Sequence, residues 1–300
     1  MPAKLPVLSP SLCALSKLVS TFSCILLSAS LSAQDSALSQ TVMEIEDQLN
    51  ARLGAAVLVV GSDRSWQYRG DELFPLSSTF KPLACAALLQ RVDASTESLD
   101  RIVPVKNTDL VSYSPVTETR VDSVGMSLAE LCDAAITVSD NTAGNLVLAA
   151  IEGPAGLTHF MGSIGDRVTR LDRWETELNE ARPGDYRDTT SPLAMAEAIE
   201  KLVLGEVLSA SSREKLSGWL KGNTVGEALF RATIPDNWEI GDKSGAGGYG
   251  SRSIAAILWP PSGSPVIATV YITETDASFD ERNAAIAEIG TAIAGWVAEQ

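Results

Sequence analysis

The sequence predicts an α+β protein with two lobes: an α/β lobe, in which helices flank a five-stranded antiparallel sheet, and an all-α lobe. Two strand patterns lie near the N-terminus, three lie near the C-terminus, and the chain between them has mostly helical spacing. Strands that follow one another without alternating helices favour antiparallel pairing. We assign residues 34–75 and 223–300 to the α/β lobe and residues 76–222 to the all-α lobe, and we expect a small-molecule site at their boundary.

The individual elements follow from local patterns. Segments that resemble strands are bounded by turn residues and cover residues 55–60, 65–74, 238–243, 251–259 and 266–273. Helical spacing marks residues 36–53, 78–92, 127–138 and 142–151, and a last helix from residue 279 to about residue 297. Capping boxes, formed by a serine and a later glutamate, are expected at Ser127, Ser211 and Ser278. Residues 171–192 lack a regular period and are rich in charges, which predicts a long functional loop.

The first 33 residues predict an export signal. They contain Lys4 and Lys17 but no acidic residue, followed by an apolar run over residues 18–27 and by small residues that end at Ala33. The apolar run is too short to form a stable membrane anchor. We expect cleavage after Ala33 and a protein that acts in the periplasm or in the medium.

The chain is acidic, which excludes one class of partner. Its formal net charge of -15 becomes -17 when the two lysines of the export signal are removed. Nucleic-acid binding by counterion release is therefore not expected. With 45% hydrophobic and 20% charged residues, the composition is typical of a globular protein, which we expect to act as a monomer on a small molecule.

Four cysteines divide between the export signal and the rest of the chain. Cys85 and Cys132 remain after cleavage, and an even pair in an oxidising compartment favours a disulfide, with two buried thiols as the alternative. Cys13 and Cys24 lack the surroundings typical of a lipidated cysteine, so a lipid anchor is disfavoured.

His159 is the only histidine, and this limits the chemistry. Its surroundings lack other catalytic residue types, so we interpret it as a structural or surface residue. A zinc site that needs two or three histidines cannot be built, and a Ser-His-Asp triad would have to use His159. We therefore expect no metal or other cofactor, and any nucleophilic serine must be activated by a group other than an imidazole.

The motif Ser78-Thr-Phe-Lys81 carries the first chemical signal. In a helix the two outer residues would share a face, so that the Lys81 amine could reach the Ser78 hydroxyl. Ser78 would lie at the positive end of the helix dipole, which favours a negative charge forming there. A serine with a base beside it and amide donors around it has the arrangement of an activated nucleophile. The same spacing recurs at Ser212 and Lys215, in a polar stretch typical of a solvated helix start, so this motif is not decisive alone.

Three more polar motifs follow Ser78 in order. They are Ser139-Asp-Asn141 between two helical runs, Glu175 in the long loop, and Lys243-Ser-Gly245 at a strand end. Taken singly, each has an ordinary interpretation as a helix cap, a solvated charge or a strand end. Their combination favours Ser78, because Ser212 and Lys215 have no such partners in the right order.

This set resembles the class A β-lactamases, which share Ser-x-x-Lys, Ser-Asp-Asn, Lys-Thr-Gly and a loop glutamate. The resemblance covers nearly the whole chain after residue 33, including residues 109–118, 169–179, 187–190 and 242–247. It implies the family's two-lobe fold and hydrolysis of the amide bond of β-lactams, namely penicillins and some cephalosporins.

The resemblance also implies roles in acylation. Ser78 would attack the lactam carbonyl, and its N–H and that of Ala246 would form the oxyanion hole. Lys81, or Glu175 through a water, would take the serine proton, and the choice stays open. Ser139, assisted by Lys243, would pass a proton to the leaving nitrogen.

For the later step, Glu175 and Asn179 would hold and deprotonate the water that releases the acyl group. The groups that the resemblance places against the substrate are Tyr113, Asn141, Lys243, Ser244, Gly245 and Arg252. Arg173 and Asp188 would pair at the neck of the long loop, and Cys85 and Cys132 match a disulfide that many members have.

The chain departs from the family at a few positions. Thr176 replaces the proline that often follows the glutamate, so a cis bond there would precede a non-proline residue. Ser77 and Gly247 stand where one carbapenem-hydrolysing branch has a second disulfide, so that activity is not expected. Carbenicillin-specialised members tend to have an arginine at the position of Lys243. Ser244 replaces the usual threonine of the motif and keeps its hydroxyl.

Two other classes of protein share part of this set of motifs. A D-alanyl-D-alanine peptidase or penicillin-binding protein would also be acylated but would lack Glu175 and Asn179, which together make a positioned base. An exported sensor or cell-wall-binding module that is merely acylated would need Ser78 but not the intact set of motifs.

Overall fold

The structure is a computed structural model that describes residues 1–3 and 35–298. Apart from residues 1–3, the predicted export signal lies outside the described residues, as do its cleavage site at Ala33, Cys13 and Cys24. Within the described part of the chain, no helix combines the length and the apolar character needed to cross a bilayer.

A five-stranded antiparallel sheet forms the centre of one half of the molecule, which confirms the predicted fold class. Its order is β2-β1-β9-β8-β7, so that the two ends of the chain meet where β1 pairs with β9. The strands are β1 (Arg52–Val59), β2 (Ser65–Tyr68), β7 (Glu239–Ala246), β8 (Arg252–Trp259) and β9 (Val266–Thr273). Every residue of β9 is buried, because helices cover both faces of the sheet.

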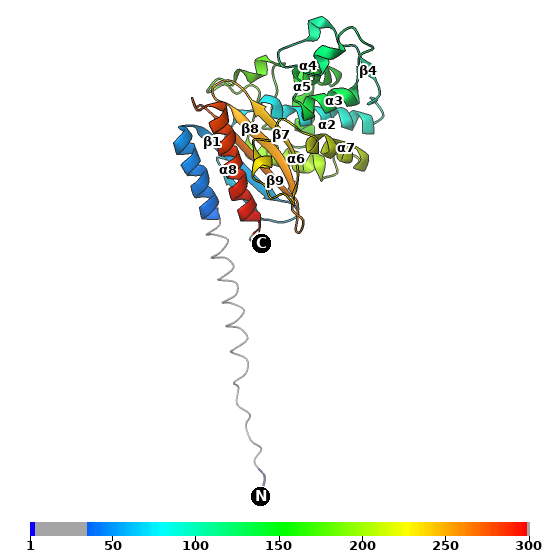
Figure 1. Cartoon of the computed structure of the whole chain (residues 1–300). Coiled ribbons are helices and arrows are strands. Elements are labelled where there is room, and N and C mark those ends of the chain that lie inside the picture. Colours follow the sequence, from blue (N-terminus) through cyan, green and yellow to red (C-terminus); the bar gives the residue numbers. More distant parts are fainter. Residues whose placement is uncertain (4–34, 299–300) are drawn as a thin grey trace.

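Side chains alternate between the two faces of the sheet and build two apolar clusters. One cluster packs the helix of residues 35–49 and α8 (Phe279–Ala298) against one face, with Val42, Ile286 and Ile289 fully buried. Figure 1 shows these two helices on the same side of the sheet. On the opposite face, α6 (Pro192–Val203) packs on β1, β8 and β9.

The central segment is mostly helical and is organised around α2 (Phe80–Asp93). Most of α2 is apolar on all sides, and it is buried among helices that contact it from several directions. These helices are α3 (Leu128–Thr137), α4 (Asn141–Ala150), α5 (Gly153–Ser163) and α7 (Ala210–Lys221). The apolar cluster around α2 continues through α6 to the sheet, so the boundaries of the two lobes stay a proposal.

The predicted disulfide between Cys85 and Cys132 is confirmed. It joins α2 to α3, with 5.8 Å between the Cα atoms.

Two short ladders complete the strands that the structure describes: β3 (Phe74–Pro75) pairs with β6 (Thr189–Thr190), and β4 (Ile102–Val103) pairs with β5 (Met126–Ser127). The 3₁₀ turns are η1 (Ser77–Thr79), η2 (Asn107–Asp109), η3 (Thr117–Arg120), η4 (Glu177–Glu180) and η5 (Phe230–Ala232).

Several predicted boundaries are wrong by a few residues. The first helix ends at residue 49 instead of residue 53, because β1 already pairs with β9 from Arg52. The predicted second strand, residues 65–74, divides into β2 and β3.

The capping boxes at Ser127 and Ser278 are confirmed, but the one at Ser211 is wrong. Instead, Ser209 caps α7 by accepting a hydrogen bond from the Ser212 N–H. The Asp93 carboxylate accepts hydrogen bonds from both the N–H and the hydroxyl of Ser209, which moves the helix start to Ala210.

Candidate active site

Ser78 lies in the 3₁₀ turn η1, and α2 begins only at Phe80, so the predicted α-helix start at Ser78 is wrong. The turn is held by Thr79, whose N–H and hydroxyl both donate to Leu76 O, at 3.1 and 2.6 Å. Ser78 faces a cleft of about 560 Å³ between η1, the start of α4 and the end of β7.

Lys81 is completely buried beneath this cleft, and its amine is surrounded by oxygen atoms. Nζ donates to Ser139 O at 2.8 Å, to Asn141 Oδ1 at 2.7 Å and to Ser139 Oγ at 3.3 Å. Among the described residues, none of the hydrogen bonds of Nζ goes to the Ser78 hydroxyl, so the spacing of the motif does not by itself give that bond. Burial lowers the pKa of the Lys81 amine, although the nearby Glu175 carboxylate acts in the opposite direction.

The Ser139-Asp140-Asn141 segment both caps a helix and contributes to the cleft, which are the two roles that its sequence suggested. Asp140 caps α4, because its Oδ1 accepts from the Ala143 N–H at 2.8 Å. Asp140 Oδ2 also accepts from the Thr117 N–H at 2.9 Å, which ties the preceding loop to the helix. Ser139 and Asn141, on either side of this cap, both face the cleft and bond to the Lys81 amine.

Glu175 is buried beside Lys81, with 3.3 Å between Oε1 and Nζ. Its other oxygen, Oε2, accepts a hydrogen bond from Asn179 Nδ2 at 2.5 Å. Glu175 Oε1 and Asn179 Oδ1 are buried acceptors without a hydrogen-bond partner among the described residues. The peptide bond between Glu175 and Thr176 is cis.

Asn145 positions Glu175, and sequence reasoning missed it. Its amide donates to Glu175 O and accepts from the Glu175 N–H, both at 2.9 Å. The available signal was its place on α4, four residues after Asn141 and therefore on the same helix face.

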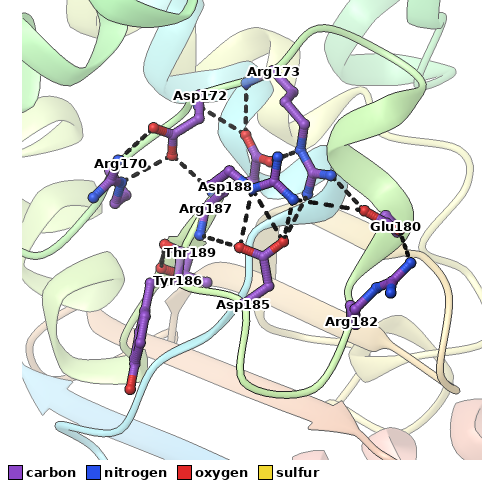
Figure 2. A network of polar contacts seen from close by, with 10 residues as sticks. All are labelled: Arg170, Asp172, Arg173, Glu180, Arg182, Asp185, Tyr186, Arg187, Asp188 and Thr189. Atoms are coloured by element: carbon purple, nitrogen blue, oxygen red, sulfur yellow. Dashed lines mark hydrogen bonds and ion pairs between the residues drawn. The ribbon is translucent and has the colours of Figure 1, made fainter.

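Arg173 and Asp188 close the neck of the long loop, as Figure 2 shows. Arg173 Nε donates to Asp188 Oδ2 at 2.6 Å, and Asp188 Oδ1 accepts from the Arg173 N–H at 2.9 Å. Arg173 also pairs with Glu180 at 2.7 Å, and Arg187 pairs with Asp185 at 2.6 Å. The loop that carries Glu175 is therefore held by ion pairs within itself.

Lys243 is the second buried amine at the cleft, and it lies in β7. Its Nζ donates to Ser244 O at 2.7 Å. Burial, and to a smaller extent the positive charge of Lys81, lower its pKa well below the ordinary value. The neighbouring Asp242 pairs with Arg231 at 2.6 Å on the other side of the strand.

Arg252 begins β8 opposite Ala246, and most of its surface is buried. Its guanidinium donates to Asn283 Oδ1 at 2.8 Å and to Gly245 O at 3.0 Å, and it lies over the Phe279 ring at 4.7 Å. Burial lowers the pKa of Arg252 to about 10. Asn283 and Phe279 were missed because they belong to α8 and carry no motif.

The cleft brings together most of the residues predicted for the site. The predicted residues that line it are Ser78, Tyr113, Ser139, Asn141, Asn179, Ser244, Gly245, Ala246 and Arg252, and Lys81, Glu175 and Lys243 are buried. Residues that sequence reasoning did not place there are Thr224, Val225, Glu227, Ala228, Phe279 and Asn283. His159 is exposed and does not line the cleft. At the second Ser-x-x-Lys motif, the Ser212 hydroxyl donates to Asp93 Oδ1 at 2.7 Å. The second Ser-x-x-Lys therefore belongs to the start of α7.

Comparisons with known proteins agree with this geometry. A family model described as the Beta-lactamase enzyme family matches residues 37–297. The Beta-lactamase AER-1 of Aeromonas hydrophila is 49% identical over 87% of this chain and 86% of its own length. A Beta-lactamase of Rhodobacter capsulatus is 48% identical over 88% and 89% of the two chains. The solved structure of an ancestral (GNCA) class A β-lactamase is similar with a TM-score of 0.84, at 53% identity, and covers 86% of this chain and 99% of that one.

Proposed function

Since the chain belongs to the β-lactamase enzyme family, within class A, and is a β-lactam hydrolase, we propose that it acts through an acyl-enzyme on Ser78. A water molecule activated by Glu175 then hydrolyses this acyl-enzyme and releases the product. One observation carries this proposal. The Glu175 carboxylate is buried 3.3 Å from the Lys81 amine and is bonded to Asn179, at the cleft that Ser78 lines. We propose penicillins and some cephalosporins as substrates.

Acylation begins when Ser78 Oγ attacks the lactam carbonyl carbon. The serine proton passes to Lys81, or to Glu175 through a water. The lowered pKa of Lys81 increases the fraction of neutral amine at pH 7, and a neutral amine can accept a proton. The main-chain N–H groups of Ser78 and Ala246 are the proposed donors to the oxyanion that forms on the carbonyl oxygen.

The C–N bond of the lactam then breaks, and its nitrogen needs a proton. Ser139 supplies this proton through its hydroxyl, which lines the cleft. Lys81 can restore it, because Lys81 Nζ already donates to Ser139 Oγ at 3.3 Å. Lys243, whose amine is buried in β7, is proposed to assist this transfer.

Deacylation uses two buried oxygens that accept no hydrogen bond from any described residue. Glu175 Oε1 and Asn179 Oδ1 can each accept one hydrogen of the same water molecule, which aligns its oxygen lone pair for attack on the ester. Glu175 takes the proton as the water attacks, and Ser78 Oγ leaves with a proton returned to it.

Substrate recognition follows from the charges and hydrogen-bonding groups around the cleft. Arg252, Lys243 and the Ser244 hydroxyl are proposed to bind the substrate carboxylate. Asn141, at the start of α4, is proposed to contact the side-chain amide, and Gly245 in β7 lines the same cleft. Tyr113, which is 58% exposed, is proposed to form a wall of the cleft.

The test is steady-state turnover of a chromogenic cephalosporin and of benzylpenicillin by purified protein that begins after residue 33. Continued turnover far beyond one equivalent is expected. A stoichiometric burst without further product would favour a peptidase or an acylated sensor instead.

We further propose that the chain is exported to the periplasm or the medium and acts as a monomer.

A further inference from the structure

We propose that Glu227 is a specificity-determining residue that favours β-lactams with a positive charge next to the ring carboxylate, such as cephalosporins with a cationic group at C3. This inference rests on the proposed function. Its basis is that Glu227 is exposed and lines the same cleft as Ser78, Ser244 and Arg252.

The chain around Glu227 is held firmly. It follows α7 and precedes η5, and Asn223 Nδ2 donates to the buried Asp242 at 2.6 Å. The Thr224 N–H donates to Thr137 O at 2.9 Å, and Leu229 is completely buried. Gly226 lies so close to Asp242 that a Cβ there would be 2.3 Å from Asp242 Oδ2. The Glu227 carboxylate is therefore carried by main chain with little freedom to move away.

Glu227 is also the only carboxylate among the described residues that line the cleft. Glu227 forms no ion pair with any described residue. Arg252, in contrast, is buried, and its guanidinium donates to Asn283 Oδ1 and Gly245 O. Lys81, Lys243 and Glu175 are buried. The exposed lining of the cleft therefore carries one negative charge on the wall of residues 224–228, and Arg252 carries the positive charge.

The chemistry of the substrate connects these two charges. In a cephalosporin the carbon that bears the carboxylate is bonded to C3, so a substituent at C3 projects from the ring next to the carboxylate. If Ser244 and Arg252 hold the carboxylate, that substituent lies beside the wall of residues 224–228. Ser244 adjoins this wall, because its hydroxyl donates to Val225 O at 3.4 Å. A cation at C3 is then attracted by Glu227, and an anion is repelled.

Cephaloridine and cephalothin test this proposal, because both have a thienylacetamido side chain and they differ only at C3, pyridinium in one and acetoxy in the other. The measurement is the ratio of their kcat/KM values for the parent enzyme, Glu227→Gln and Glu206→Gln. Glu206 is an exposed carboxylate that does not line the cleft, so its variant removes the same charge elsewhere. We expect the ratio to fall about threefold to tenfold in Glu227→Gln, in line with a screened unit charge several ångströms away, and to stay unchanged in Glu206→Gln.

Salt provides a second readout. Sodium chloride should lower the ratio of the parent enzyme towards that of Glu227→Gln and should leave the ratio of the variant almost constant. An equal ratio in the parent and Glu227→Gln would overturn the assignment of Glu227 while leaving the proposed function intact. Failure of the parent enzyme to turn over either cephalosporin would contradict the proposed hydrolysis of cephalosporins, and Glu227 would then have no role in selecting them.

Discussion

Glu175 Oε1 lies 3.3 Å from Lys81 Nζ, and both side chains are fully excluded from solvent. The two residues come from different elements, the long loop and α2, and in the proposed mechanism their proximity would make one shared proton-transfer site. Lys81 also bonds to Ser139, so the proposed acylation and protonation steps meet at one amine.

Replacing Glu175 by alanine should leave acylation possible but stall the release of product. The water would lose its base, and general-base catalysis contributes about 10²- to 10⁴-fold. Mass spectrometry after mixing with benzylpenicillin should show a covalent adduct, and kcat should fall by a similar factor. Glu177→Gln is the control, since Glu177 is an exposed carboxylate in the same loop. Normal turnover by Glu175→Ala would mean that another group is the deacylation base.

Asn145→Ala should also slow deacylation, because two hydrogen bonds that fix the main chain of Glu175 are lost. We expect a smaller fall in kcat than in Glu175→Ala, because the carboxylate itself remains. Stopped-flow kinetics should show a burst of acylation followed by a slow steady state. If Asn145→Ala lowered stability alone and kept the parent kcat, Asn145 would have no positioning role.

The disulfide between Cys85 and Cys132 should stabilise the protein without taking part in catalysis. It closes a loop with a sequence separation of 47, worth about 4 kcal/mol when estimated from chain entropy alone. Alkylation of denatured, unreduced protein should leave both cysteines unmodified. Urea unfolding of the Cys85→Ala, Cys132→Ala variant should show the lower stability, while the kcat of the folded variant should match that of the parent.

Ser77→Ala should maintain or increase stability. The Ser77 hydroxyl is buried and has no hydrogen-bond partner among the described residues, and such a group costs about 1–3 kcal/mol. Thr79→Val is the contrasting variant, because the Thr79 hydroxyl donates to Leu76 O and also contacts Tyr271. Chemical unfolding should place Thr79→Val below the parent protein and Ser77→Ala at or above it.

Lys243→Met should increase stability at neutral pH and weaken substrate binding. The pKa of Lys243 is lower in the folded than in the unfolded state, so the unfolded chain binds more protons between these two values. The stability of the parent protein therefore rises with pH in that window, relative to the variant. Thermal unfolding at pH 7 and pH 9.5 should show a smaller difference between the two proteins at the higher pH. An equal difference at both pH values would count against a depressed pKa.

Much of the fold could be predicted because its signals are local. Strand patterns are read over a few residues, and the placement of five of them near the two ends of the chain was enough to predict the antiparallel sheet. The boundaries were less accurate, as at Ser209, where a side chain from α2 decides the start of α7. A contact of that kind joins residues 116 positions apart and leaves no local pattern.

The family and the antiparallel sheet could be predicted from the chain alone, because motif order and strand pattern are properties of the sequence. The two cysteines after residue 33 favoured a disulfide, and the structure distinguished it from two buried thiols. The partners of Lys81, in contrast, depend on tertiary contacts. Spacing directed its amine to Ser78, whereas the packing of α4 and the long loop against α2 surrounds it with Ser139, Asn141 and Glu175. Helical spacing fixes which residues share a face, but the direction of a long buried side chain depends on which polar atoms the neighbouring elements bring within reach.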